Sequence, residues 1–171
     1  MIALNNDKQS GQIIQKAWKE EKCPIINGII FGNGKVVLLD VEDFHSIIRK
    51  RMQKKSIKVI SHSDLNELED TNRLEWSYIT ELFEINDSSR GIRISCGEGG
   101  MGADGFVAVT QEGTDVLEWI AFFDISNPFM EIHIHDNEII ATTNLGDKWH
   151  FLMNKPESVY IELGDGTGIK K

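Results

Sequence analysis

The most metal-like spacing in the chain belongs to two histidines beside carboxylates in the segment EIHIHD, residues 131–136. On a β-strand, Glu131, His133 and His135 project to one face, because successive side chains alternate between the two faces. Such a set can bind zinc and activate water for hydrolysis, but a catalytic zinc site usually needs a third protein ligand. Nothing nearby in the sequence supplies that ligand. We predict no metal and no other cofactor, with a hydrolase built on His133 and His135 as the alternative.

Cys96 and the serines are the possible nucleophiles. Nucleophilic catalysis requires a base within hydrogen-bonding reach and a third group that orients this base. No recognisable nucleophile motif surrounds these residues. Cys96 and Cys23 form no CxxC pair and are too few for a disulfide framework, which is typical of a reducing compartment. We predict that the protein is not an enzyme.

A glycine-rich segment, GEGGMGADG at residues 97–105, invites comparison with phosphate-binding loops. It lacks the order GxxxxGK[ST], and the residues after it, FVAV, are typical of a strand and not of the helix that would hold a phosphate. The pattern favours a bulged or flexible connection between strands. Such a loop on a rigid sheet can also serve as a recognition element.

Basic residues are concentrated between Arg49 and Lys58. A cluster of lysine and arginine on one helix can bind phosphates of a nucleic acid, which is a second alternative function. No aromatic residue in the cluster offers a platform for base stacking, and cations at a helix end also complement its dipole. We therefore expect a solvated helix end and no nucleic-acid partner.

Length, composition and charge narrow the class of protein further. A chain of 171 residues with 40% hydrophobic and 26% charged residues is typical of one globular domain. It has no apolar stretch long enough to span a membrane and no signal peptide, which predicts a cytoplasmic protein without membrane contact. Residues 1–62 hold 11 Lys/Arg against 6 Asp/Glu, whereas residues 63–171 hold 7 against 21. The acidic second part would attract a basic partner.

The elements that must position these residues follow from hydrophobic periodicity. The first half predicts a helix over 10–22, ended by Pro24, and a hairpin of strands 25–31 and 35–39 around a Gly-Asn-Gly turn. A second helix is expected after Asp40, with Phe44, Ile47, Ile48 and Met52 on one face and basic residues up to Lys55 on the other. A strand over 56–61 and a short acidic helix through Asp70 complete this half.

In the second half, alternating or apolar runs are separated by turn residues. They predict strands over 74–85, 91–95 and 159–163, and an antiparallel meander from 104 to 153. The apolar run 117–129 predicts a strand covered on both faces, or an edge strand that awaits a partner. Residues 164–171 are expected to be a disordered tail. The predicted fold class is α+β: one domain with a largely antiparallel sheet flanked by N-terminal helices.

The order of four motifs in this half resembles a known family. DGFVAV (104–109), LEWIAFFDISNPF (117–129), EIIATTN (138–144) and KWHFLM (148–153) are similar to small immunity proteins of bacterial polymorphic-toxin and contact-dependent inhibition systems, over residues 98–163. The resemblance implies a cytoplasmic protein that binds one cognate toxin domain, often a basic nuclease. Binding would cover the active site or the substrate surface of the toxin.

The resemblance supplies no individual contact residue, so the candidate partner-binding residues come from their positions in the predicted elements. We expect exposed carboxylates around the glycine loop and at strand ends and turns. These are Glu98, Asp104, Asp124, Glu131, Asp136, Glu138 and Asp147.

Overall fold

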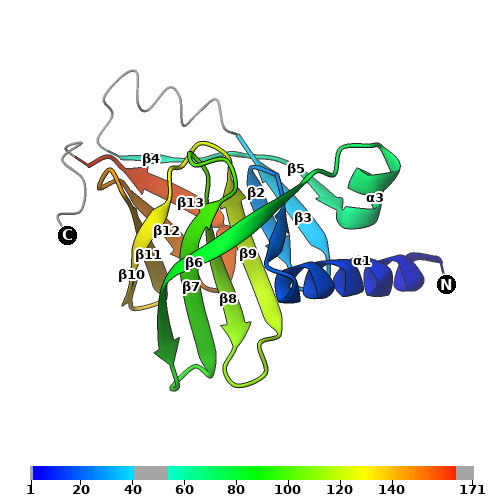
Figure 1. The fold of residues 1–171 in the computed structure, drawn as a ribbon, viewed down its shortest axis with the longest axis horizontal. Helices are drawn as coiled ribbons and strands as arrows, with labels where there is room; N and C mark the ends of the chain where they lie inside the picture. The colour runs from blue at the N-terminus through cyan, green and yellow to red at the C-terminus, as the bar shows by residue number, and fades with distance from the viewer. Residues whose placement is uncertain (1, 41–53, 165–171) are drawn as a thin grey trace.

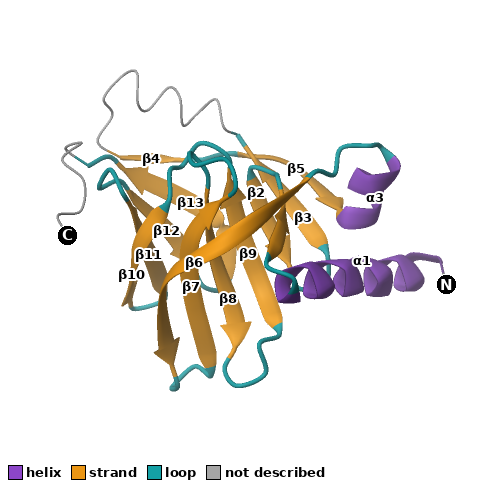
Figure 2. Ribbon diagram, in the orientation of Figure 1, coloured by secondary structure: helices purple, strands orange, loops and turns teal. Residues whose placement is uncertain are grey.

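The computed structural model describes residues 2–40 and 54–164. These residues form two antiparallel sheets, with a long helix near the N-terminus and a short helix further on (Figures 1 and 2). The structure confirms a mostly antiparallel β protein with an N-terminal helix. Whether it is a single domain stays a prediction.

The helices are α1 (Ile2–Lys19) and α3 (Leu65–Asp70). The strands are β1 (Lys22–Pro24), β2 (Gly28–Phe31), β3 (Lys35–Leu39), β4 (Lys54–Ser56), β5 (Val59–Asp64), β6 (Trp76–Asp87), β7 (Ile92–Gly99), β8 (Gly105–Gln111), β9 (Leu117–Phe123), β10 (Phe129–His135), β11 (Glu138–Thr143), β12 (Lys148–Leu152) and β13 (Lys155–Glu162). The large sheet has the order β1-β6-β7-β8-β9-β2-β3-β5, and the small sheet has the order β10-β11-β12-β13-β4.

Helix α1 covers the outer face of the large sheet. Its predicted apolar stripe is confirmed, because Ile14, Ala17 and Trp18 are buried. The helix ends at Lys19, three residues before the predicted end, and the chain turns at Glu21, which has a φ of 55°. The residues that follow form β1 at the edge of the sheet, where the missing N–H of Pro24 is tolerated.

The side chain of Gln15 joins α1 to two strands of the sheet below it. Its Nε2 donates to the carbonyl oxygens of Gly32 at 3.1 Å and Leu117 at 2.8 Å, and its Oε1 accepts from the amide of Leu117 at 2.9 Å. These bonds satisfy backbone groups at the ends of β2 and β9. They fix the helix on the sheet.

Replacing Gln15 with leucine should lower the free energy of unfolding by about 1–3 kcal/mol, because the change leaves partly buried backbone groups without their partner. Urea denaturation followed by circular dichroism measures the change. Gln12→Leu is the matched control, since Gln12 is exposed on the same helix. Equal stability of the two variants would contradict the role given to Gln15.

The predicted hairpin of β2 and β3 is confirmed. It also explains why the strands predicted as one meander over 104–153 do not all belong to one sheet. Strand β2 pairs with β9 as well as with β3. Since β8 occupies the other edge of β9, the next strand has no free edge there and begins the small sheet. The strands of the meander are therefore present but are divided between two sheets at the turn 124–128.

The remaining predictions of elements have mixed outcomes. The strand assigned to 74–85 is confirmed as β6, and the acidic helix is confirmed as α3 with Asp64 as its N-cap. The strand expected over 56–61 is instead two strands, β4 and β5, and Lys54 and Lys55 lie in β4 and not on a helix. The helix expected to carry Phe44 to Met52, with Arg49, and the tail 165–171 lie outside the described residues.

Two apolar cores result from this arrangement. One lies between the two sheets and includes Trp119, Phe123, Trp149 and Phe151. The other lies between the large sheet and the two helices. Strand β9 is therefore buried on both faces, which confirms the first of the two predictions for the run 117–129, and β8 beside it is buried in the same way. The large sheet curls until β6 and β7 pack against β10 of the small sheet (Figure 1).

Candidate functional site

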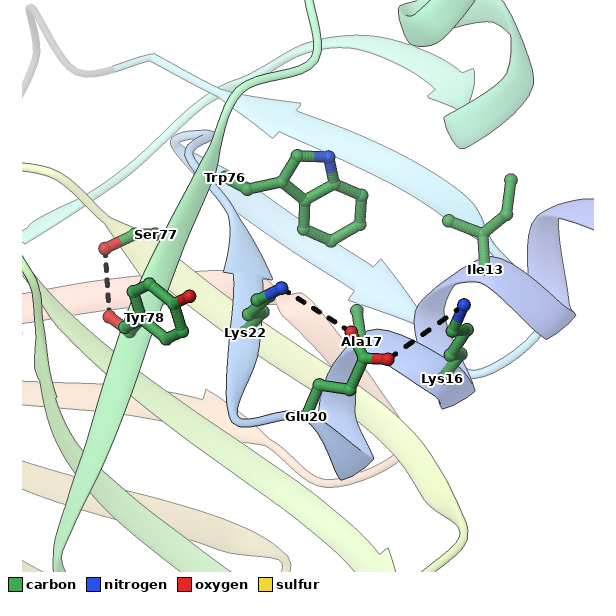
Figure 3. Close-up of a pocket in the computed structure, with 8 residues that line it drawn as sticks. All are labelled: Ile13, Lys16, Ala17, Glu20, Lys22, Trp76, Ser77 and Tyr78. Atoms are coloured by element: carbon green, nitrogen blue, oxygen red, sulfur yellow. Dashed lines mark hydrogen bonds and ion pairs between the residues drawn. The ribbon is translucent and has the colours of Figure 1, made fainter.

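A groove lies between the second half of α1 and the paired strands β1 and β6 (Figure 3). Its volume is about 520 Å³. One wall is helical and aliphatic, and the opposite wall is an aromatic strand. The lining residues are Ile13, Lys16, Ala17, Glu20, Lys22, Trp76, Ser77 and Tyr78.

The aromatic wall arises from the alternation of side chains along β6. Ser77 and Ile79 are buried toward the helix-covered core. Trp76 and Tyr78 alternate with these residues and line the groove, where 39% and 69% of their surfaces are exposed. Large aromatic side chains with this exposure beside a groove are typical of a binding surface.

Three charged side chains line the same groove. Glu20 forms ion pairs with both neighbouring lysines, with Lys16 Nζ at 4.0 Å from Oε1 and Lys22 Nζ at 3.6 Å from Oε2. Lys22 Nζ also lies 5.4 Å from the centroid of the Tyr78 ring, within the range of a cation–π contact. Polar and aromatic groups thus meet at one end of the groove.

The glycine-rich loop is connected to this groove. Gly100 donates its amide to Ser77 Oγ at 2.9 Å, which fixes the loop beside β6. Asp104 accepts the amides of Met101 and Gly102, both at 3.2 Å, and is fully buried. The expected exposure of Asp104 is therefore wrong, because its carboxylate is used to fold its own loop. Glu98 is half-buried on β7.

The other carboxylates that were expected to be exposed and to bind a partner lie in separate parts of the fold. Asp147 is also buried, because it accepts the amide of Gly164 at 2.8 Å, so its expected exposure is wrong as well. Asp124 is half-buried at the end of β9. Glu131, Asp136 and Glu138 belong to the small sheet and its first turn. The seven residues do not form one cluster, and whether any of them binds a partner stays a prediction.

Histidines and carboxylates share the outer face of the small sheet. His133 and His135 are exposed and lie 3.8 Å from Glu131 and 3.6 Å from Asp136. His150 is buried, with Nδ1 at 3.1 Å from Glu138. It stacks on Tyr160, whose pKa is raised to about 12 by burial and then by the hydrogen bond to Glu138. In the described part of the chain, no three His, Cys, Asp or Glu side chains are grouped to hold a metal ion.

A second hollow, of about 400 Å³, lies on the other side of the C-terminal end of α1. Arg93 from β7 projects into it and forms ion pairs with Glu81, Glu84 and Asp115. Burial raises the pKa of Glu81, while Arg93 opposes this shift. Arg93 and its three carboxylates are paired with one another, which is typical of a structural network.

Both cysteines lie in the apolar cores. Cys96 Sγ donates to the carbonyl of Phe129 at 3.4 Å, and burial, followed by the charges of Glu81 and Glu131, raises the pKa of this thiol to about 12. Burial also raises the pKa of Cys23. Below these pKa values the thiols stay protonated, and a protonated thiol is a poor nucleophile.

Neither cysteine of the folded protein should therefore react with a thiol-specific disulfide reagent at pH 8 within an hour. Both should react in urea, where the chain is unfolded and the thiols regain an ordinary pKa of about 8.5. The absorbance of the released thiolate measures this. Rapid reaction of one thiol in the native protein would contradict the burial described here.

The comparisons with known proteins add no relative. No protein-family model matches the chain, and no curated protein and no solved structure matches it. The function is therefore inferred from the geometry of this chain.

Proposed function

We propose that this protein is an immunity protein, which binds a cognate bacterial toxin domain and covers its active site or substrate surface. The observation that carries the proposal is the groove beside α1. Its exposed Trp76 and Tyr78, next to the charged group of Lys16, Glu20 and Lys22, have the composition of a protein-binding hot spot. In this proposal the protein acts by occupying a surface and performs no bond chemistry.

The charge distribution supports a basic partner, such as a nuclease domain. Residues 63–171 carry 21 Asp/Glu against 7 Lys/Arg, and many of these carboxylates lie on exposed turns and on the outer face of the small sheet. A long-range field of this sign accelerates the encounter with a basic protein. The aromatic groove would then supply most of the affinity, and the carboxylates would supply steering.

The location follows from the same proposal. None of the described helices is long and apolar enough to cross a lipid bilayer. We place the protein in the cytoplasm, where a toxin domain would reach its target and where reduced cysteines such as Cys23 and Cys96 are usual.

Co-expression tests this function directly. The probes are the C-terminal domains of the proteins encoded next to the gene for this protein, each expressed from an inducible promoter. We expect one of them to stop growth when it is expressed alone, and growth to be restored when the full chain is present. The two proteins should co-elute as a stoichiometric complex. If every toxic domain remains toxic and none forms a complex, the proposed function is wrong.

A further inference from the structure

The charges lining the groove do not balance. Lys16 and Lys22 both pair with Glu20, so two ammonium groups share one carboxylate and the three side chains carry one net positive charge. Together the two ammonium groups have six N–H donors, more than the roughly four lone-pair sites of one carboxylate can accept. The side chains of Lys16 and Lys22 are 78% and 35% exposed. A further carboxylate can therefore reach them from solvent.

The apolar part of the groove lies next to these lysines. The indole of Trp76 extends from β6 toward Ile13 on α1, and Ala17 lies on the same helix and also lines the groove (Figure 3). Ala17 is buried, but Trp76 keeps 39% of its surface exposed. An apolar side chain placed between the helix and this ring would remove that surface from water.

Together these features define the chemistry of the bound segment. We infer that the groove beside α1 binds a segment of the partner protein in which an aromatic or aliphatic side chain contacts Trp76 and a neighbouring aspartate or glutamate binds Lys16 and Lys22. This inference rests on the proposed function, in that the partner is a protein. It adds that a toxin that is basic overall presents an acidic side chain at this groove.

The test uses the full chain labelled with ¹⁵N and three sets of synthetic peptides as probes. Every peptide carries one tryptophan or leucine. A test residue lies within one helical turn or two strand positions of it, and this test residue is glutamate in the first set, glutamine in the second and lysine in the third. We expect the glutamate peptides to shift the amide signals of Lys22 and Tyr78 and the indole signal of Trp76. The glutamine peptides should bind about three- to fivefold more weakly, as expected for an exposed ion pair, and the lysine peptides more weakly still.

Charge reversal in the protein provides the decisive comparison. Lys22→Glu should reverse the order of affinities, so that lysine peptides bind better than glutamate peptides. Lys148→Glu is the matched control, because Lys148 is exposed on a strand of the small sheet, and it should leave the order unchanged. The spectrum of each variant without peptide shows whether it is folded.

Three results would overturn the inference: no shift at millimolar peptide, shifts confined to another surface, or equal binding of the three sets. These results are distinct from failure of the proposed function. If the protein neutralised a toxin but did not bind the peptides selectively, the inference about the groove would be wrong and the proposed immunity function would stand. Selective peptide binding by a protein that neutralises none of the toxin domains would refute the immunity function alone.

Discussion

Trp76→Ala is expected to weaken binding of the toxin domain by about 30-fold or more, because a central aromatic hot-spot residue contributes at least about 2 kcal/mol. The indole forms much of the apolar wall of the groove, and its exposed part is the surface that a partner would bury. Tyr78→Ala should add to the loss, since this ring also contacts Lys22. Isothermal titration calorimetry with the purified toxin domain measures both effects.

The control for this experiment is an exposed apolar residue outside the groove. Leu145, in the turn between β11 and β12, is 44% exposed, which is close to the exposure of Trp76. Leu145→Ala should change the dissociation constant by less than about threefold, because most residues outside a hot spot contribute little. Unchanged binding by Trp76→Ala, with a native circular dichroism spectrum, would exclude the groove as the centre of the interface.

Local patterns in the sequence were sufficient to predict α1 and β6 beside this groove, but not the short strand β1. The apolar stripe of α1 and the alternation of β6 each follow from the periodicity of one segment, and both are confirmed. Which sheet a predicted strand joins was not predictable in the same way. β9 and β10 follow each other in sequence, but they belong to different sheets because β2, from the distant N-terminal half, occupies the free edge of β9.

The groove itself was missed because hydrophobicity does not distinguish a buried aromatic residue from an exposed one. Trp76 and Tyr78 have the spacing of core residues on a strand. They alternate along β6 with Ser77 and Ile79, which are buried, and line the open groove beside α1 and β1.

The opposite error occurred at the carboxylates. Asp104 and Asp147 were predicted to be exposed because they lie in turns rich in glycine, where aspartate usually faces solvent. Both instead accept backbone amides and are enclosed by the segments that they organise. At Asp104 the relevant signal was the glycine at position 99, where an added Cβ would lie 2.2 Å from Asp104 Oδ2. An aspartate close to several glycines can thus be an internal cap.

Trp149→Ala is expected to have the largest effect on stability, lowering the free energy of unfolding by about 3–5 kcal/mol. Trp149 is 1% exposed, and its ring centroid lies 4.4 Å from that of Phe123 and 5.7 Å from that of Phe129. It therefore joins the large sheet to the small one across the turn that separates them. Trp149→Phe should cost clearly less, because it keeps an aromatic ring between the sheets.

Urea denaturation followed by circular dichroism distinguishes these two variants, with Leu152→Ala on the same strand as the control. Leu152 is 36% exposed on the outer face of the small sheet, so this change should alter stability by less than about 1 kcal/mol. If Trp149→Ala were as stable as Leu152→Ala, the ring would not lie between two packed sheets. The division of the predicted meander into two layers would then be wrong, because this division is what places Trp149 against Phe123.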